Sequence, residues 1–542
     1  GAGRFTTNPD PVWVEHVAAG LGLPLDPRAA GGTNYAEGGA RVATPRPGAP
    51  GDLSRLPVSS QIDAFLAGGG TFRADDLVIL QGGGNDVFAT QANGLSFTPE
   101  DLAVLDQAAA DLAQQAQRIA AAGGPTVVTT SVPRFEVFNS RYRAALAQAG
   151  VNLLYVDVAG LISEIEANPG EFGIVNVTDR ACRGRAVESF TCLPADYVTP
   201  DANRTYLFAD AVHFTGIVHE LEADLTLAAL IAPSQIGQLP LAGRAVLQSA
   251  TRGLKAQLGG APLEPGRWQA FGWADAGDYD VDPSAGVGGL DGGLGGATMG
   301  VAYGLRPWLT VGGALGWSEA DGDFAGDLGG FEMRAITAQA FARAAIGRFD
   351  LTLDAAYGDL DFDDVTRKVN LGPALRVERG DTHGRMWSAG VEAGMTHEAG
   401  AFALRPFAGL RYERVEAEAY SEAGDRSSQI TFGDQTVEQL FGSVGAEISW
   451  RGQGRRAVQP YLRASYEVDL MDDTPKLSIL THGAPVAFSS APYALDGEYF
   501  AYAAGARVEL QPGLSLAAEV AGTAGRSDGE ATTVRLGLRG RF

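Results

Sequence analysis

The sequence predicts an α/β domain followed by a membrane β-barrel of about twelve strands, and three observations carry this prediction. Up to about residue 235, short apolar segments alternate with segments rich in helix formers. From Gly266 to Phe542, apolar residues alternate with polar or small ones at a period of two. Glycine accounts for 73 of the 542 residues, nearly twice its usual share of ~7%. A mean hydropathy of −0.02, with no apolar run near the ~20 residues of a membrane helix, excludes helical spans but not strands.

In the first part, the alternation indicates a parallel sheet covered by helices. Strands are expected at Leu77–Leu80, Thr126–Thr130 and Val151–Val156. Helices are expected at Leu102–Ala122, which is followed by two glycines, and at Ser140–Gly150.

In the second part, segments such as Met299–Leu305 and Trp387–Met395 show the alternation of barrel strands. Short turns, such as Arg306-Pro307, alternate with long acidic or glycine-rich loops, such as the one expected at Glu319–Gly330. This asymmetry is typical of outer-membrane barrels. A soluble β-sandwich is the alternative, but it would not place charged residues and Gly on one face and aromatic residues at the ends of the other.

The last strand, Thr532–Phe542, has a predicted orientation. Because an Arg on the lipid face near the midplane costs about 2–4 kcal/mol, the arginines of this strand should face the lumen or the periplasmic rim. The residues expected to face lipid are Val534, Leu536, Leu538 and Phe542, and those expected inside are Thr533, Arg535, Arg539 and Arg541.

The charge balance, 41 − 65 = −24, makes nucleic acid an unfavourable partner, because the chain repels phosphate backbones. Cys182 and Cys192 are its two cysteines. A local pair of this kind predicts a disulfide in an oxidising compartment, with two free thiols as the alternative. The chain opens at Gly1 without Met, so we expect a processed or truncated product whose signal peptide has been removed.

The carboxyl-terminal part resembles the translocator of an autotransporter, on the basis of the helix-forming segment Leu241–Leu258, the strands after it and the final Arg-Phe. The resemblance implies that residues 1–235 form a passenger, 236–262 a linker and pore helix, and 263–542 the barrel. It also implies a location in the outer membrane of a Gram-negative bacterium, contact with its lipid and insertion machinery, and a monomer with its passenger at the cell surface. A solvent-exposed linker helix is the alternative for the pore helix.

The chemistry of the first part centres on Asp210 and His213. At this spacing a carboxylate can reach the imidazole Nδ1–H, fix the tautomer and stabilise the imidazolium. His16 and His219 lack a comparable context, and His219 is expected to pack or to lie in the following helix.

Two glycine-rich turns offer groups that could stabilise an oxyanion. Gln81–Asp86 follows an apolar strand, where open α/β sheets place their sites, and Asn85 could donate its side-chain amide. Gly32–Ala40 could present a backbone N–H. Both segments could also be ordinary turns.

Together these segments resemble the GDSL, or SGNH, esterase and lipase family. GTNYAEGGA resembles the family's second block, GGGNDVF its third and DAVHFT its fifth, although Phe214 replaces a frequent Pro. The resemblance implies an SGNH-hydrolase fold and the hydrolysis of ester or lipid substrates without metal or organic cofactor. The implied roles are acid for Asp210, base for His213, and oxyanion donors for Gly39 and Asn85.

The family's nucleophilic block, Gly-Asp-Ser-Leu, is absent from the sequence, and we expect it just upstream of Gly1. Ser54, Ser59 and Ser60 lie between the second and third blocks, where the family's nucleophile does not occur. These 542 residues alone should therefore be inactive. The alternative function is a non-catalytic adhesin or interaction passenger, and a diffusion porin is disfavoured because the linker helix would plug the lumen.

Overall fold

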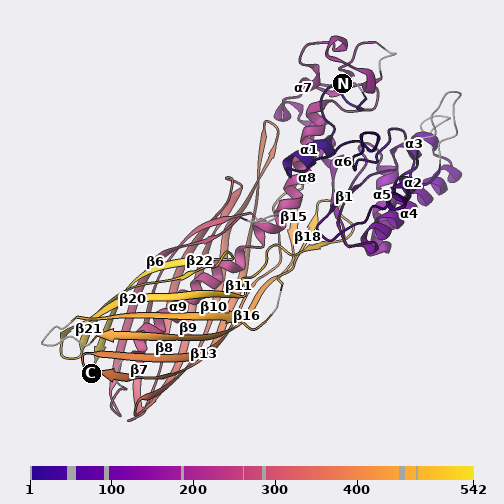
Figure 1. Ribbon diagram of the computed structural model, residues 1–542. Helices are drawn as coiled ribbons and strands as arrows, with labels where there is room; N and C mark the ends of the chain where they lie inside the picture. Colours follow the sequence, from indigo (N-terminus) through magenta and orange to yellow (C-terminus); the bar gives the residue numbers. More distant parts are fainter. Residues whose placement is uncertain are drawn as a thin grey trace.

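The computed structural model describes residues 3–44, 56–90, 97–184, 188–259, 262–283, 288–450, 458–471 and 474–542. An N-terminal domain of helices and short strands stands at one end of a long β-barrel, and a helical segment runs from the domain into the barrel (Figure 1). The carboxyl terminus lies at the barrel end farthest from this domain (Figure 1).

The N-terminal domain contains a three-stranded parallel sheet, β1 (Leu77–Leu80), β2 (Thr126–Thr130) and β3 (Leu154–Val156), in that order. A second, two-stranded parallel sheet joins β4 (Asn176–Arg180) to β5 (Tyr206–Phe208). The helices are α1 (Trp13–Gly20), α2 (Val58–Ala67), α3 (Gly84–Thr90), α4 (Pro99–Ala121), α5 (Glu136–Ala149), α6 (Val158–Ala167) and α7 (Ala202–Thr205), with 3-10 turns η1 (Arg28–Ala30), η2 (Pro169–Phe172), η3 (Ser189–Thr191) and η4 (Pro194–Asp196). The predicted arrangement of parallel strands and helices is confirmed at this level.

Local sequence explains the limits of α4, the longest helix of the domain. Thr98 caps its first turn by accepting a hydrogen bond from the Asp101 N–H, and Pro99 occupies the first helical position. Gly124 then adopts a φ of 68°, which a residue without Cβ tolerates best. The helix begins three residues before the predicted Leu102, because the cap and not the first apolar residue sets its start.

The second part is a closed barrel. Thirteen segments are hydrogen-bonded in one sheet, and β12 (His397–Ala399) is a short continuation of β11, so the wall has twelve strands, as predicted. Pairing of β22 with β6 and of β11 with β13 completes the ring. The wall strands are β6 (Trp268–Val281), β7 (Leu290–Arg306), β8 (Leu309–Phe324), β9 (Gly329–Ile346), β10 (Phe349–Leu371), β11 (Ala374–Met395), β13 (Phe402–Ala417), β16 (Gln435–Trp450), β17 (Val458–Asp469), β20 (Glu498–Gln511), β21 (Leu514–Ala524) and β22 (Glu530–Arg541).

The orientation predicted for the last strand is confirmed. Val534, Leu536 and Leu538 are 54%, 58% and 48% exposed, whereas Arg535 is 2% exposed and hydrogen-bonded inside the barrel to Ser249. Arg539 also points inward, where it donates to the Gly259 carbonyl.

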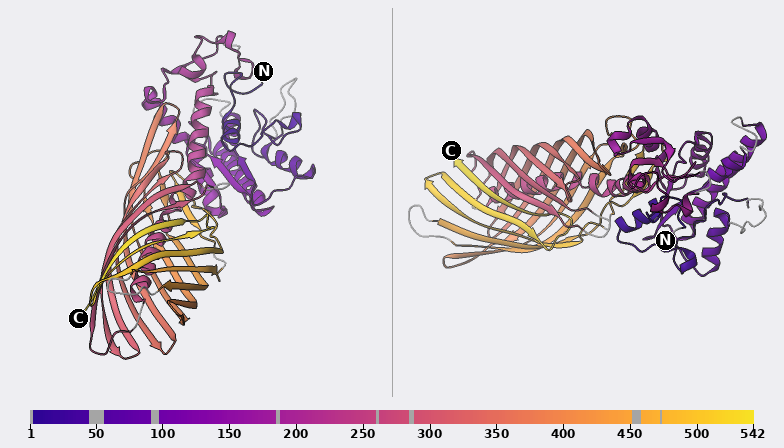
Figure 2. Two further views of the ribbon diagram at one scale, coloured as in Figure 1. Left: turned by 60° about the vertical axis from the view of Figure 1, so that its left-hand side comes forward. Right: turned by 90° about the horizontal axis from the view of Figure 1, so that it is seen from above.

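The helical segment consists of α8 (Gly216–Ile236) and α9 (Leu239–Leu258), and α9 lies inside the wall of strands (Figure 2). Polar side chains bind it there: Arg244 pairs with Asp528, and Arg507 donates to the Ala256 carbonyl near the helix end. The predicted pore-threading helix is confirmed, and the solvent-exposed alternative is wrong.

The expectation that no helix is apolar enough to span a membrane is wrong for Gly216–Leu258. Its most apolar stretch reaches a mean hydropathy of 1.3, and 83% of that stretch is buried inside the molecule. Uncharged polar residues such as Gln235 and Gln238 interrupt the apolar run in this segment without adding charge. A search for uninterrupted apolar runs therefore does not find it.

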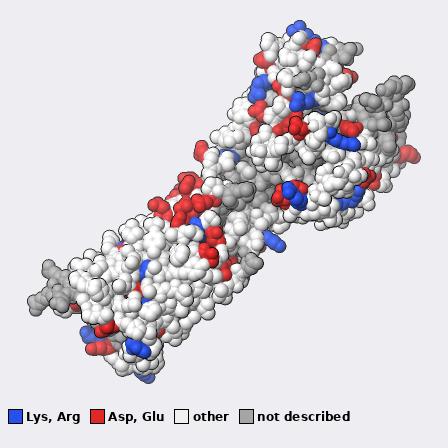
Figure 3. Space-filling view, in the orientation of Figure 1, with Lys and Arg blue, Asp and Glu red and all other residues white. Residues whose placement is uncertain are grey.

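The barrel strands extend farther toward the N-terminal domain than expected. The loop predicted at Glu319–Gly330 is mostly strand, because β8 continues to Phe324 and β9 begins at Gly329. A membrane crossing needs ~9–11 residues per strand, so the polar ends of these longer strands lie outside the hydrocarbon. Figure 3 shows acidic side chains gathered at this end of the barrel.

A small sheet on this rim contacts the N-terminal domain. It consists of β14 (Tyr420–Ser421), β15 (Ile430–Phe432), β18 (Leu477–Thr481) and β19 (Phe488–Ser490). Asn152 exchanges two hydrogen bonds with Ser489, and Glu164 accepts hydrogen bonds from Ser427 and Arg376. The domain is therefore seated on the barrel rim and not only tethered by α8.

Candidate active site

Asp210 and His213 form a hydrogen-bonded pair directly after β5. His213 Nδ1 lies 2.8 Å from Asp210 Oδ2 and 3.0 Å from Oδ1. The main-chain N–H groups of Val212 and His213 also donate to Oδ1, at 2.9 Å each. These hydrogen bonds stabilise the turn from Asp210 to His213. The turn places the imidazole beside the carboxylate, as the spacing of the two residues predicts.

The Asp210 carboxylate is built to stay ionised. It is only 5% exposed, and burial alone raises the pKa of a carboxyl group. The hydrogen bonds from His213, from the Ser189 N–H and from its own turn outweigh burial and hold the pKa of Asp210 well below its usual range. An ionised carboxylate on Nδ1 leaves Nε2 as the nitrogen that can accept a proton.

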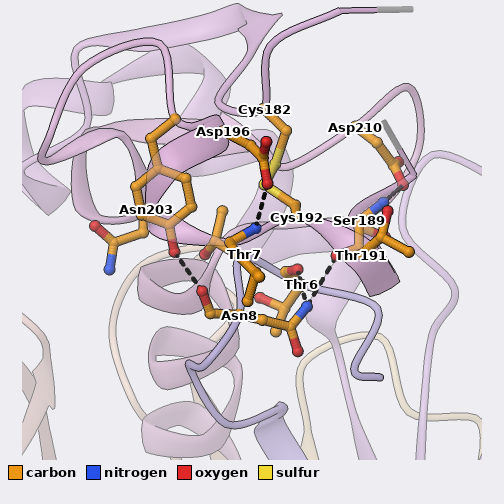
Figure 4. The surroundings of a disulfide bond; sticks show 12 residues. Thr6, Thr7, Asn8, Cys182, Ser189, Thr191, Cys192, Asp196, Asn203 and Asp210 are labelled. Carbon is orange, nitrogen blue, oxygen red and sulfur yellow. Dashed lines mark hydrogen bonds between the residues drawn. A yellow bond between two sulfur atoms is a disulfide. The ribbon is translucent and has the colours of Figure 1, made fainter. Parts of the chain in front are cut away.

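The Ser189 contact comes from a loop that the disulfide closes. The structure joins Cys182 to Cys192, with their Cα atoms 6.0 Å apart, and the Ser189 N–H donates to Asp210 Oδ2 at 2.8 Å (Figure 4). In Figure 4, Asn8 reaches the same loop from the N-terminal segment, and its side-chain amide donates to the Ser189 carbonyl at 2.9 Å.

Phe5 is the second group that touches the imidazole. Its ring centroid lies 4.7 Å from that of His213 and 5.6 Å from that of Phe190. Phe5 also packs against Gly38, where an added Cβ would lie 1.8 Å from the Phe5 ring. This close approach brings the glycine-rich turn that contains Gly39 to the side of the His213 ring.

Asn85 and Gly39 lie on neighbouring segments. Asn85 is in the first turn of α3, just after β1, and its side-chain amide donates to the Ala40 carbonyl at 2.9 Å. An Asn amide carries two hydrogens, so one remains available. Gly39 adopts a φ of 79°, and within the described residues its N–H has no hydrogen-bond acceptor. The four residues predicted for the site therefore come from segments that contact one another through Phe5 and Ala40.

Asp86 fastens these two segments together. It is 1% exposed, and it accepts hydrogen bonds from Arg41 Nε and from the Val42 N–H, both at 3.0 Å. Burial raises the pKa of Asp86 despite these two donors.

The other sequence candidates lie elsewhere. Ser59 and Ser60 are in α2, where the Ser59 N–H donates to the Val42 carbonyl, and Ser54 lies outside the described residues. His219 is buried in α8, 3.5 Å from Glu222, and His16 is in α1. In the part of the chain that the structure describes, no group of three or more His, Cys, Asp or Glu side chains is arranged to hold a metal ion.

Three residues of this region were not predicted from the sequence. Asp86 carried a signal, because it directly follows Asn85 in the glycine-rich turn. Ser189 acts through its main chain and Phe5 is an ordinary aromatic residue, so neither side-chain type points to a site.

Residues 270–521 match the family model of the autotransporter β-domain. The barrel is an autotransporter β-domain. The chain therefore resides in the outer membrane, with its N-terminal domain as a passenger at the cell surface. Among solved structures, the translocator domain of the autotransporter NalP from Neisseria meningitidis is similar at 18% identity and a TM-score of 0.44, over 55% of this chain and 97% of that one.

The alignments with two relatives are longer than the barrel and therefore extend into the passenger. The chain is 28% identical over 360 residues to esterase EstA of Pseudomonas aeruginosa. This alignment covers 64% of the chain and 55% of EstA. It is 24% identical over 409 residues to lipase 1 of Photorhabdus luminescens, in an alignment that covers 73% of this chain and 59% of that protein. The chain thus spans less than two thirds of the length of either relative.

Proposed function

We propose that the passenger is a GDSL-type carboxylesterase or lipase, displayed at the cell surface by the barrel. The observation that carries the proposal is the Asp210–His213 pair. Nδ1 of His213 is bound to a buried, ionised carboxylate, while Nε2 has no hydrogen-bond partner among the described residues. This is the orientation a general base needs. The names of the relatives, an esterase and a lipase, agree with it.

In the proposed reaction, His213 takes the proton of a serine hydroxyl as that oxygen attacks the carbonyl carbon of an ester. Asp210 holds the imidazole in place and stabilises the imidazolium that forms. His213 then returns the proton to the departing alcohol, and water repeats the sequence on the acyl-enzyme. The free hydrogen of the Asn85 amide and the Gly39 N–H would stabilise the oxyanion, each worth roughly 3 kcal/mol in the transition state.

We assign the nucleophile to a serine that precedes Gly1 in the gene product. The N-terminal segment supports this assignment, because Phe5 packs against His213 with the ring centroids 4.7 Å apart, and the Asn8 N–H donates to the Cys192 carbonyl of the neighbouring loop. The described chain therefore begins beside the His213 ring, which is why we assign the nucleophile to a residue before it. On this proposal, the 542 residues alone do not hydrolyse esters.

The test compares hydrolysis of p-nitrophenyl butyrate by the chain as given and by a version carrying the upstream residues. We expect activity only in the longer version, and His213→Ala in that version should lower kcat by about 10⁴- to 10⁶-fold, the range seen on loss of a triad member. His383→Ala is the matched control, because His383 is exposed on the barrel strand β11. An unchanged rate in His213→Ala would remove the base from the proposal, and hydrolysis by the 542-residue chain would remove the upstream nucleophile.

A further inference from the structure

We propose that the loop segment 189–192, which ends at the Cys182–Cys192 disulfide, positions the catalytic pair, and that the main-chain N–H of Ser189 is the group that fixes Asp210. The inference rests on the proposed ester-hydrolase function and assigns a positioning element to it. Contacts on both sides of the imidazole lead to this loop.

The first contact is on the acid side. Asp210 Oδ2 accepts from both the Ser189 N–H and His213 Nδ1, each at 2.8 Å. Its remaining hydrogen bonds come from Val212 and His213, which belong to the same turn as Asp210. Among the described residues, Ser189 is thus the donor that ties this carboxylate to the rest of the domain. Without it, the turn and its imidazole can shift together.

The second contact is on the ring side. The Phe5 ring packs against the His213 ring at a tilted angle of 39°, and the residues around Phe5 are bound to the loop. The Gly3 N–H donates to the Phe190 carbonyl at 2.8 Å, and Asn8 donates to the carbonyls of Cys192 and Ser189 at 3.1 and 2.9 Å. One four-residue stretch, 189–192, therefore holds both neighbours of the imidazole.

The disulfide anchors this stretch to the segment that lies beside Asp210. The Cys182 N–H donates to the carbonyl of Ala209, the residue before Asp210, at 3.1 Å. The cross-link joins Cys182 to Cys192, at the end of the 189–192 stretch. Both cysteines are buried in a small apolar cluster with Ala181, Tyr197, Ala202 and Ala209. The loop that caps Asp210 is thus covalently linked to Cys182, which in turn is hydrogen-bonded to the residue before Asp210.

Ser189→Pro removes the donor with little demand on the backbone. Ser189 is the first residue of η3, a position that proline favours, and the preceding Glu188 is already extended at φ −78° and ψ 147°, as a residue before proline must be. The pyrrolidine ring takes the place of the N–H hydrogen and displaces the Asp210 carboxylate. Ser189→Ala is the matched control, because it keeps the N–H and removes a hydroxyl that has no hydrogen-bond partner in the part of the chain that the structure describes.

Kinetics on p-nitrophenyl butyrate, with the version that carries the upstream residues, give the readout. Ser189→Pro should lower kcat about 10²-fold, the effect of a small misplacement of a catalytic group, while KM stays within about twofold. Ser189→Ala should retain both constants. A merely structural role for Ser189 would lower the amount of folded enzyme and leave kcat per folded molecule intact.

Cys182→Ala/Cys192→Ala tests the cross-link and decides the matter if Ser189→Pro does not fold. It keeps the N–H but frees the loop, so kcat should fall about tenfold or more with KM little changed. Wild-type kcat in folded Ser189→Pro, or in the double cysteine variant where Ser189→Pro does not fold, overturns the inference. His213→Ala separates the two levels: if that variant remains active, the ester-hydrolase proposal fails first.

Discussion

Gly83 shows how a missing side chain shapes the turn that presents Asn85. Its φ is 102°, and an added Cβ would lie 2.2 Å from the Phe138 ring, which is fully buried. The turn therefore needs glycine for two reasons, an unusual backbone conformation and close packing on an aromatic residue. The Val87 N–H donates to the Gly83 carbonyl, so Gly83 also accepts a hydrogen bond from the first turn of α3.

We expect Gly83→Ala to destabilise the passenger more than a glycine replacement that meets no neighbour. Gly124→Ala is the control, because Gly124 has a φ of 68° with nothing within 4 Å of its added Cβ. The control should cost about 1–2 kcal/mol of left-handed strain, and Gly83→Ala should cost about 1–3 kcal/mol more through overpacking. Urea denaturation followed by circular dichroism measures both, and equal costs would contradict the packing argument.

At this scale the sequence predicts contacts within one turn and misses contacts between distant segments. The spacing of Asp210 and His213 was sufficient, because a carboxylate three residues before an imidazole reaches it within a single turn. The Ser189 N–H comes from 21 residues away and Phe5 from the N-terminal segment. No local pattern marks either residue, since their positions are set by the disulfide and by tertiary packing.

At the scale of elements, the period-two pattern predicted the barrel wall well. Alternate residues of each strand face lipid, which favours apolar side chains, and the lumen, which favours polar ones. The pattern placed Arg535 inside and Leu536 outside correctly. It did not predict the rim sheet that seats the passenger, because β18 and β19 are short and bind partners such as Tyr155 and Asn152, more than 300 residues away. Contacts of this kind between distant segments produce no periodic pattern in the sequence.

The rim sheet contains a titratable contact with the passenger. His482, just after β18, lies with Nδ1 2.8 Å from Asp157 at the start of α6 and with Nε2 3.1 Å from Asp425, on the loop before β15. Burial alone lowers the pKa of this imidazole, but the hydrogen bonds and charges of the two carboxylates outweigh burial and raise the pKa above its usual value. The protonated ring can donate to both carboxylates at once, and the neutral ring to only one.

The sign of the pH effect follows from the raised pKa. A group whose pKa is higher in the folded state stabilises that state fully below its unfolded pKa of about 6.5, and the stabilisation is lost as the pH rises through the folded value. We therefore expect the melting temperature of the docked passenger to exceed that of His482→Gln at about pH 6 and the difference to shrink toward about pH 9. His397→Gln, on the short strand β12, is the control. A difference independent of pH would show that His482 acts by packing alone.

At the scale of the whole molecule, the barrel closes where the chain ends. Strand β22 pairs with β6, and at the edge of this seam Phe542 and Trp268 exchange main-chain hydrogen bonds of 3.0 Å in both directions. Phe542 is 62% exposed and lies at the barrel end away from the passenger (Figure 1). An aromatic ring at a membrane boundary is favoured there, and the resemblance to outer-membrane proteins implies that the insertion machinery reads this residue.

Deleting Phe542 should therefore reduce insertion without altering the chemistry of the passenger. The deletion removes the boundary ring and two hydrogen bonds of the seam, whereas the Asp210–His213 pair lies in the domain at the opposite end of the molecule. We expect less heat-modifiable barrel in the outer membrane and unchanged kcat per inserted molecule, measured with the version that carries the upstream residues. Phe542→Tyr keeps the ring and the backbone bonds and should insert normally. Normal insertion after the deletion would refute the signal role, and a fall in kcat per inserted molecule would show that barrel closure reaches the active site through the docked rim.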